Sequence, residues 1–203
     1  MSPESVAQDV PTPPTLGRPR DRSLDDRALV ATRALLLEVG FEATTVQAVA
    51  KRSGVHTSAI YRRWPNRLSL IHDAAFSDIP PGQVHPTGDL RNDLHRFVAA
   101  YVATFELPVV RAASPGIIAA TIAGGDPAGP VDHLSVRPQL RAILDSAADD
   151  EVDRSIDSDD VFDLILGAIL VRVLVPAEVR PPAKIDDLVD LVARALNPRP
   201  TSS

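Results

Sequence analysis

The sequence predicts an all-α fold for this chain of 203 residues. Apolar residues recur at steps of three and four along most of it, which is the spacing of one buried helix face. Ala and Leu are abundant, whereas alternating runs of β-branched residues, which would indicate strands, are few. Cysteine is absent, so neither a disulfide framework nor a thiolate metal site is expected, which fits a cytoplasmic protein.

The N-terminal segment is predicted to form a disordered basic arm. Residues 1–22 are rich in Pro, Ser and Thr and hold little that a core could bury. Arg18 and Arg20 flank a proline there, in a short basic stretch of the kind that can lie in an A·T-rich minor groove. A tail with incidental arginines is the alternative interpretation.

A first helix is expected from about Ser23 or Leu24 to Val39. Its apolar residues return at helical spacing, which predicts one buried face. Gly40 closes the helix, because glycine readily takes the left-handed conformation found at helix ends. Phe41 is expected to fold back onto it. The residues expected to face inward are Ala28, Ala31, Leu35 and Val39.

Residues 44–67 contain two short helical patterns joined by a tight turn. The first opens at Thr44 and runs out at Gly54, and the second runs from about His56 to Trp64, where a proline stops it. The residues expected to face inward are Val46, Val49, Ala50, Val55, Ala59, Ile60 and Trp64. Such a pair is typical of proteins that present the second helix to a DNA groove. The signal is specific because all its parts occur together.

The charge is divided along the chain in a way that agrees with this interpretation. Residues 18–72 carry ten Arg or Lys against five Asp or Glu, a net charge of +5. From Asp73 onward, eleven bases face twenty acids, a net charge of −9. A basic N-terminal module on an acidic body suggests that only one end approaches phosphate. Solvated faces without a partner are the alternative.

Further helices are predicted downstream. Asn66 caps the next one, Pro108 ends or kinks the long one after it, and Ser114 with Pro115 forms the N-cap and first position of another. A loop is expected at 124–130. The expected helix ranges are 66–76, 88–106, 114–122, 137–149, 159–175 and 185–196. The predicted domains are a helix-turn-helix domain at 23–76 and a helical dimerisation and effector-binding domain at 77–198, with a disordered tail at 199–203.

The segment 159–175 is apolar almost all the way round the helix that it predicts. In a chain of this size its own core covers one side, so the remainder suggests a contact between two subunits. A fully buried central helix in a monomer is the alternative. The residues assigned to a dimer interface are Leu140, Leu144, Phe162, Ile165, Ile169 and Val173.

The stretch from about Leu24 to Phe76 resembles the TetR family of transcriptional regulators. The motifs that carry the resemblance are Gly40-Phe41, Thr44-Thr45-Val46, Ser53-Gly54-Val55, Ile60-Tyr61-Arg62-Arg63-Trp64 and Asn66-Arg67-Leu68. The resemblance implies an Ω-shaped homodimer whose two heads bind successive major-groove faces of a palindromic operator. It also implies C-terminal helices that form the interface and often a pocket for a small inducer. The sequence departs from the family at His56, where a Ser or Thr cap is common, and at Arg63-Trp64, which replaces His or Tyr followed by Phe.

The predicted DNA contacts lie on the two short helices. Side chains at the start of the recognition helix reach base edges, and arginines on it reach bases or phosphates. The threonines begin a helix, whose N-terminus can bind phosphate. Gln47 either reads an adenine edge or closes a capping box with Thr44. The full set is Thr44, Thr45, Gln47, His56, Thr57, Ser58, Tyr61, Arg62, Arg63 and Arg67.

A ligand pocket is predicted in the C-terminal domain, for a largely apolar ligand of drug size. Plain core packing is the alternative for the same residues, which are Phe97, Tyr101, Phe105, Ile118, Ile122, Leu166 and Leu170. The histidines lack metal-ligand spacing, and no nucleophile elbow, phosphate loop or dinucleotide-binding turn occurs. No catalytic residue, metal or cofactor is therefore expected, and the chain is predicted not to be an enzyme.

The sequence thus predicts a cytoplasmic, sequence-specific transcriptional regulator. It is expected to act as a repressor that binds a palindromic double-stranded DNA operator as a homodimer and is released by a small apolar inducer. No membrane partner is expected, because no apolar run approaches the roughly 20 residues of a spanning helix. The alternative is a helical dimerisation or adaptor protein that keeps this fold without binding a specific operator.

Overall fold

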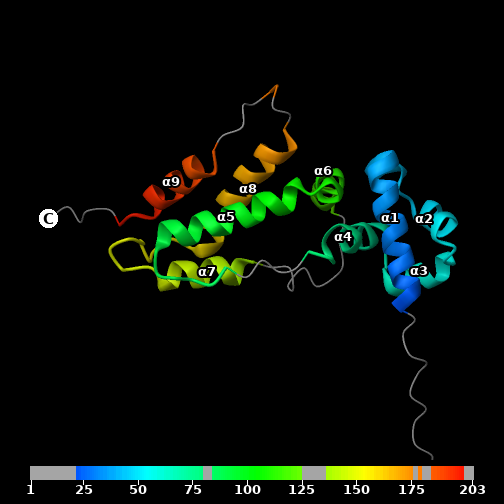
Figure 1. Ribbon diagram of the computed structural model, residues 1–203, viewed down its shortest axis with the longest axis horizontal. Helices are drawn as coiled ribbons and strands as arrows, with labels where there is room; N and C mark the ends of the chain where they lie inside the picture. The colour runs from blue at the N-terminus through cyan, green and yellow to red at the C-terminus, as the bar shows by residue number, and fades with distance from the viewer. Residues whose placement is uncertain (1–21, 80–83, 125–135, 176–177, 180–183, 199–203) are drawn as a thin grey trace, which may run out of the picture.

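The computed structural model describes residues 22–79, 84–124, 136–175, 178–179 and 184–198, and every regular element in these ranges is a helix (Figure 1). The all-α prediction is confirmed. The predicted arm, the loop at 124–130 and the C-terminal tail lie almost wholly outside the described residues. The helices are α1 (Arg22–Ala43), α2 (Val46–Ser53), α3 (Thr57–Arg63), α4 (Arg67–Phe76), α5 (Leu90–Glu106), α6 (Pro108–Ile122), α7 (Arg137–Ser146), α8 (Ser158–Leu174) and α9 (Ile185–Leu196).

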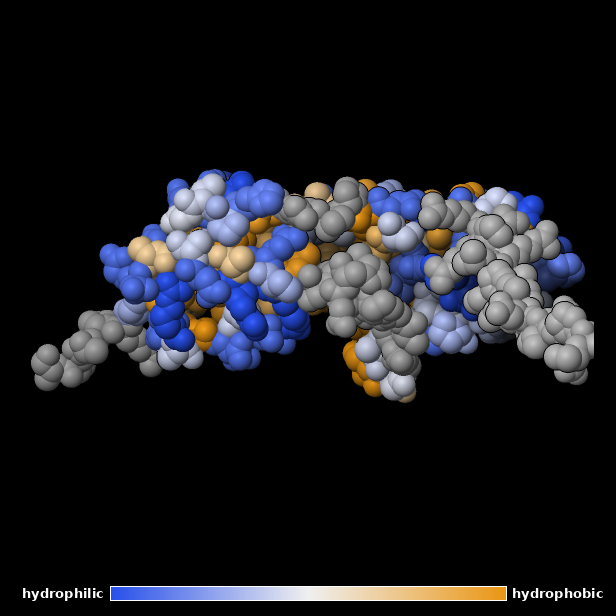
Figure 2. Space-filling view, turned by 90° about the horizontal axis from the view of Figure 1, so that it is seen from below, coloured by the Kyte–Doolittle hydropathy of each residue, from blue (hydrophilic) through white to orange (hydrophobic). Residues whose placement is uncertain are grey.

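The helices form a small head and a larger body. In Figure 1 the head, α1–α4, lies at one end, and α5, α7, α8 and α9 form the body at the other. Helix α6 contacts α1 and α4 of the head as well as α5 of the body, so it joins the two parts. Figure 2 shows one face of the molecule, where hydrophilic side chains cover most of the body end and hydrophobic ones appear between them.

Three clusters of buried apolar side chains hold this arrangement. The head cluster consists of Ala28, Ala31, Val46, Val49, Val55, Ile60, Trp64 and Leu70. A small cluster joins head to body and consists of Leu36, Ile71, Ala75 and Ala113. The body cluster is much larger, and Leu94, Phe97, Leu140, Ile143, Ile165 and Ile169 are among its fully buried members. Burial of this apolar surface is the main force that stabilises the fold.

Helix α1 is broken rather than simply ended by its glycine. Gly40 has φ 77° and ψ −179°, and one more turn of helix follows as far as Ala43. That φ lies in the region that glycine reaches at little cost. The break turns Phe41 out of the line of α1 and into contact with the small cluster of Leu36, Ile71, Ala75 and Ala113.

The sequence prediction of α6 was wrong. The helix begins at Pro108, where a missing backbone N–H costs nothing, and not at Ser114. Ser114 is buried, and its hydroxyl donates a hydrogen bond of 2.7 Å to the Val110 carbonyl instead of capping a helix. Pro115 lies inside the helix. A serine followed by proline resembles a helix start, but here Pro108 already occupies that role.

Helix α7 ends three residues before the predicted Asp149, because a side chain satisfies its last carbonyls. Arg154 donates to the Leu144 carbonyl at 2.6 Å and to the Ala147 carbonyl at 2.8 Å. Unpaired carbonyls at a helix end need such partners. Elsewhere the predicted helices agree with the structure to within about two residues, and Asn66 forms the expected cap of α4 with Ser69.

Among the described helices, no single one is long and apolar enough to cross a bilayer. Helices α5 and α6 meet the length and composition criteria only when taken together, and they are bent by 89° at their junction.

Candidate nucleic-acid interface

The first element of the site is the turn that sets α3 against α2. Val46 and Val49 anchor α2 in the head cluster, and Ile60 anchors α3 there. Between the helices, Gly54 has φ 68°, and its N–H donates to the Ala50 carbonyl at 3.0 Å. Val55 is buried in the turn itself. The two helices are therefore held at a fixed angle by apolar contacts on one side only.

The opposite side of α3 is a polar surface. Thr57, Ser58, Tyr61 and Arg62 are all exposed, whereas Ile60 is buried. Positions 57, 58, 61 and 62 share one helix face because they are related by one turn. Within the described part of the chain, no hydrogen bond or ion pair engages the Arg62 guanidinium, which leaves its donors available for a partner. We call these four residues the reading face.

Arg63 and Trp64 lie at the end of α3 and have different partners. The Arg63 Nε is 3.2 Å from the Asp25 carboxylate of α1, and its Cζ lies 5.9 Å from the centre of the Trp64 ring. The buried Trp64 donates from Nε1 to Asp73 of α4 at 2.8 Å. The tryptophan therefore anchors the end of α3, while Arg63 stays on the flank of the reading face.

The start of α2 corrects one sequence prediction. Thr45 is the N-cap, and its hydroxyl accepts a hydrogen bond of 3.1 Å from the Ala48 N–H. Thr44, the predicted cap, is buried, and its hydroxyl donates to the Gly40 carbonyl at 2.7 Å. With the cap at Thr45, Gln47 is the second residue of the helix and not the third, so it does not complete a capping box. Its side chain is exposed.

His56 occupies the N-cap position of α3 without capping it. Its backbone is extended, with φ −62° and ψ 140°, and its side chain makes no capping hydrogen bond. The ring is exposed. The side chain at this position therefore leaves α3 without a cap, and α3 is held by its apolar anchor Ile60.

Arg67 is engaged inside the protein. Its Nε donates to the Thr44 carbonyl at 2.8 Å and its Nη2 donates to the Phe41 carbonyl. Its Cζ lies 4.4 Å from the centre of the Phe41 ring. Two of its three nitrogens therefore already have partners, which leaves little of this side chain for the phosphate contact that the sequence suggested.

Other basic side chains of the head also bind within it, which sequence reasoning missed. Arg33 donates to the Ala74 carbonyl at 2.7 Å and pairs with Asp78 at 2.7 Å. Arg52 forms two hydrogen bonds with Glu38, and the Arg52 guanidinium lowers the pKa of that carboxyl group. Of these two arginines, only Arg52 had a partner that the sequence could have suggested, because Glu38 and Arg52 are opposite charges on consecutive helices. Arg18 and Arg20 lie outside the described residues.

The residues predicted to form the dimer interface are buried in the body of a single chain, so this assignment was wrong. Each of the six is at most 7% exposed and belongs to the body cluster. The reason is that α8 turns the side with Phe162, Ile165 and Ile169 inward. The helix does leave apolar residues on its outer side, since Leu164 is 48% and Val171 41% exposed.

The residues predicted to line a ligand pocket fall into two groups. Phe97, Tyr101 and Phe105 form a series along α5 with ring centres 5.2 and 6.2 Å apart, and Leu166 packs against the same cluster. Burial raises the pKa of Tyr101 to about 12. Ile122, in contrast, is 82% exposed. The structure therefore brings the aromatic residues together but leaves Ile122 out.

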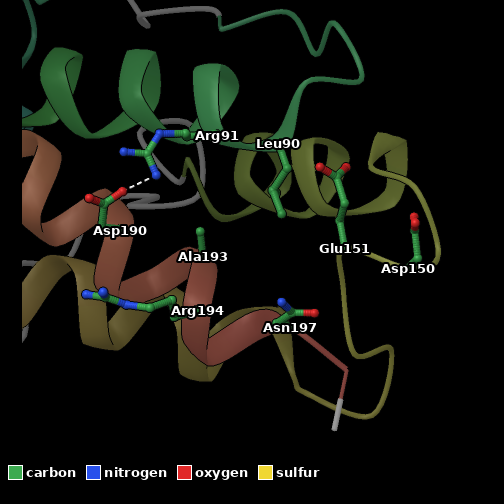
Figure 3. A pocket seen from close by; sticks show the side chains of 8 residues that line it. All are labelled: Leu90, Arg91, Asp150, Glu151, Asp190, Ala193, Arg194 and Asn197. Carbon is green, nitrogen blue, oxygen red and sulfur yellow. Dashed lines mark ion pairs between the residues drawn. The ribbon is translucent and has the colours of Figure 1, made fainter. Parts of the chain in front are cut away.

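A pocket of about 440 Å³ lies elsewhere in the body, and Figure 3 shows the eight side chains around it. It is lined by the start of α5, by α9 and by the connection between α7 and α8, and Arg91 pairs with Asp190 across it. Its lining is mostly charged, unlike the apolar pocket that the sequence predicted. The residues are Leu90, Arg91, Asp150, Glu151, Asp190, Ala193, Arg194 and Asn197.

Comparison with known protein families agrees with this architecture. The family of bacterial regulatory proteins called tetR matches residues 28–74, and the tetracyclin repressor-like C-terminal domain matches residues 84–192. An uncharacterized HTH-type transcriptional regulator of Mycobacterium tuberculosis strain H37Rv is 30% identical over 196 residues, which cover 89% of this chain and 91% of that protein. The HTH-type regulator YdeS of Bacillus subtilis is 43% identical over 61 residues, 30% of this chain and 31% of YdeS.

Solved structures have the same fold. A TetR-family regulator from Haemophilus influenzae has a TM-score of 0.54 at 15% identity, with 89% of this chain and 100% of that chain covered. NalD of Pseudomonas aeruginosa, the secondary repressor of the MexAB-OprM multidrug efflux pump, has a TM-score of 0.52 at 17% identity, with 87% of this chain and 96% of that chain covered. Together, the two domain matches and the mycobacterial relative establish that this chain belongs to the TetR family of transcriptional regulators, which are DNA-binding proteins and not enzymes.

Proposed function

We propose that this protein is a repressor that binds a palindromic operator as a homodimer and is released by a small apolar ligand. The observation that carries the proposal is the reading face of α3, where Thr57, Ser58, Tyr61 and Arg62 are exposed on a helix anchored from behind by Ile60. Arginine can bind a guanine edge with two hydrogen bonds, and hydroxyl side chains accept or donate to any base or phosphate.

The test is fluorescence anisotropy of the protein against its own upstream intergenic DNA, over a salt series and with a random duplex as control. Arg62→Ala with Arg63→Ala is expected to abolish tight binding to the specific duplex, because a two-bond guanine contact is worth about 1–3 kcal/mol. Each lost phosphate contact should lower the salt slope by about one. Arg111→Ala is the matched control, since Arg111 is an exposed arginine of α6, outside the helix-turn-helix pair.

The outcomes separate the repressor from the adaptor protein. Nanomolar binding to the upstream duplex alone supports an operator-binding regulator. Unchanged affinity in the double variant would remove the reading face from the proposal. Equal and weak binding to both duplexes calls for a selection from random DNA, and failure of that selection would favour the adaptor.

The homodimer of the proposal is formed through the outer side of α8. Leu164 and Val171 lie about two turns apart on that side, with Gly167 about one turn from each, and a Cβ added at Gly167 would meet nothing within 4 Å beyond the backbone of its own helix. A glycine flanked by apolar side chains allows two helices to approach closely. Two such faces related by a two-fold axis would be self-complementary.

Sedimentation measurements test this surface. Leu164→Asp is expected to convert the dimer to a monomer, since the charge would be buried without a partner. Ile122→Asp introduces the same charge at an exposed isoleucine of α6 and should leave the dimer intact. A dimer that persists in Leu164→Asp would move the interface away from this face.

The ligand of the proposal binds beside the aromatic series of α5. Tyr101 is half-buried, and its phenol, which is protonated near neutral pH like that of any tyrosine, can donate a hydrogen bond. Phe162 meets Tyr101 edge-on with ring centres 6.0 Å apart. A panel of apolar aromatic compounds can be screened by thermal shift, and hits should weaken operator binding. A compound that binds at saturation without changing operator affinity would count against release by a ligand.

A further inference from the structure

The link between body and head passes through one aromatic ring. After the break at Gly40, Phe41 lies directly against α6, where a Cβ placed on Gly116 would overlap its ring. The ring also contacts the small apolar cluster that includes Leu36 of α1 and Ile71 of α4. Only a glycine at 116 lets the ring approach the backbone of α6 this closely. Any displacement of α6 must therefore displace Phe41 as well.

Arg67 ties the same ring to the start of α2. The guanidinium stacks on Phe41 at 4.4 Å, and it donates to the carbonyls of Phe41 and Thr44. The Thr44 carbonyl belongs to the residue that immediately precedes the N-cap of α2. One side chain of α4 thus fixes the residues that begin the helix-turn-helix pair.

We propose that Arg67 is a positioning residue that sets the orientation of α2 and α3 on the body, through Phe41 and Gly116, and that it does not bind a DNA phosphate. The inference rests on the proposed DNA-binding function only where it is tested by affinity for DNA. A planar guanidinium can stack on a ring and donate to two carbonyls at once. Lysine keeps the positive charge but has a compact ammonium group without that geometry.

The first test uses Arg67→Lys and Arg67→Gln in the full-length protein, with Arg62→Ala as the control for a direct DNA contact. Both Arg67 variants are expected to lose about tenfold or more in affinity for a duplex selected from random DNA, because the loss of one well-placed hydrogen bond approaches that factor. Their salt slope should equal that of the wild type. Arg62→Ala should lose affinity and about one unit of slope if it contacts phosphate.

Two results would overturn the proposal. If Arg67→Lys binds like the wild type while Arg67→Gln loses about one unit of salt slope, the residue is a phosphate contact. Unchanged affinity in both variants would show that the start of α2 does not depend on this side chain.

A second test needs no DNA and therefore separates this inference from the proposed function. Hydrogen exchange of the amides of residues 45–50 should become faster in Arg67→Lys, while the amides of α9 stay protected. Gly116→Ala, made in the joining helix α6, should produce the same faster exchange in the head by pushing Phe41 away. Ala119→Val adds bulk to an exposed position of the same helix and should leave exchange at 45–50 unchanged. Slow, wild-type exchange at 45–50 in Gly116→Ala would overturn the link through Phe41.

Discussion

The head and the body of this protein are stabilised in different ways. The head buries mainly alanine and valine, and arginines tie its helices together through backbone carbonyls and carboxylates. The body buries leucine, valine, isoleucine and phenylalanine in one larger cluster made by longer helices. A small module that must keep one side free for DNA cannot bury much apolar surface. Directional hydrogen bonds therefore compensate in the head for its small hydrophobic core.

The largest expected effect comes from truncating one core residue in each part. Ile60→Ala and Ile165→Ala each remove a fully buried side chain, so each should lower the free energy of unfolding by about 2–5 kcal/mol. Urea unfolding measures both losses. If the head and the body are stabilised separately, Ile60→Ala abolishes operator binding and leaves the dimer intact. Dimer loss in Ile60→Ala would contradict the separation of the two parts.

The second largest effect is expected at Asp93, where the body also depends on directional hydrogen bonds. Asp93 is fully buried at the start of α5 and accepts from the Thr87 N–H at 2.7 Å, the Thr87 hydroxyl at 2.8 Å and Arg96. Burial alone would raise the pKa of Asp93, but these hydrogen bonds bring it below its ordinary value. Asp93→Asn should lower the free energy of unfolding by about 1.5–3 kcal/mol, the typical worth of a hydrogen bond to a charged group.

The same carboxylate predicts a pH dependence. Because its pKa is lower in the folded protein, its stabilisation is fully present above the unfolded value of about 3.9 and is lost as the pH falls through the folded value. The difference in unfolding free energy between the wild type and Asp93→Asn should therefore shrink on acidification. A difference that stays constant down to the acid limit would show that the charge of Asp93 does not matter.

The smallest effect concerns the cap of α2. Thr45→Ala removes the hydrogen bond to the Ala48 N–H and should cost about 1 kcal/mol of stability. Thr45→Ser keeps the hydroxyl and serves as the matched control. If Thr45 also contacts phosphate, Thr45→Ala lowers operator affinity by more than it lowers stability. Equal losses of operator-binding free energy and of stability would show that Thr45 only caps the helix.

The fold was predictable because its signals are local. Helical spacing, the glycine at 54 and the Asn66 cap each act within a few residues, and the structure has all three. Helix α6 was predicted wrongly because Ser114 and Pro115 look like a helix start, and only the preceding Pro108 shows otherwise. Local patterns do not reveal which of two possible starts the tertiary structure selects.

The functional residues were harder to predict because burial and pairing are decided by contacts distant in sequence. Arg67 binds carbonyls 23 and 26 residues away, so its spacing along α4 carried no sign of that role. Likewise, an apolar helix such as α8 does not reveal which side its own core covers, and Phe162 and Ile165 proved to lie inward. The reading face was easier, since Ile60 and Trp64 define the buried side of a short helix.

The ion pair between Arg63 and Asp25 makes the protein its own competitor for DNA. A phosphate that binds Arg63 competes with the Asp25 carboxylate, which lies 3.2 Å from the Arg63 Nε. Arg63 therefore contributes only the difference between two ion pairs, which is small for exposed groups. Random DNA offers phosphates but no specific base contacts. The exchange of Asp25 for a phosphate therefore lowers the affinity for random DNA and for the operator by the same amount. The additional affinity that the operator gains from base contacts is unaffected. Selectivity in this head accordingly depends on Arg62 and the hydroxyl groups beside it, while Asp25 lowers the affinity for operator and random DNA alike.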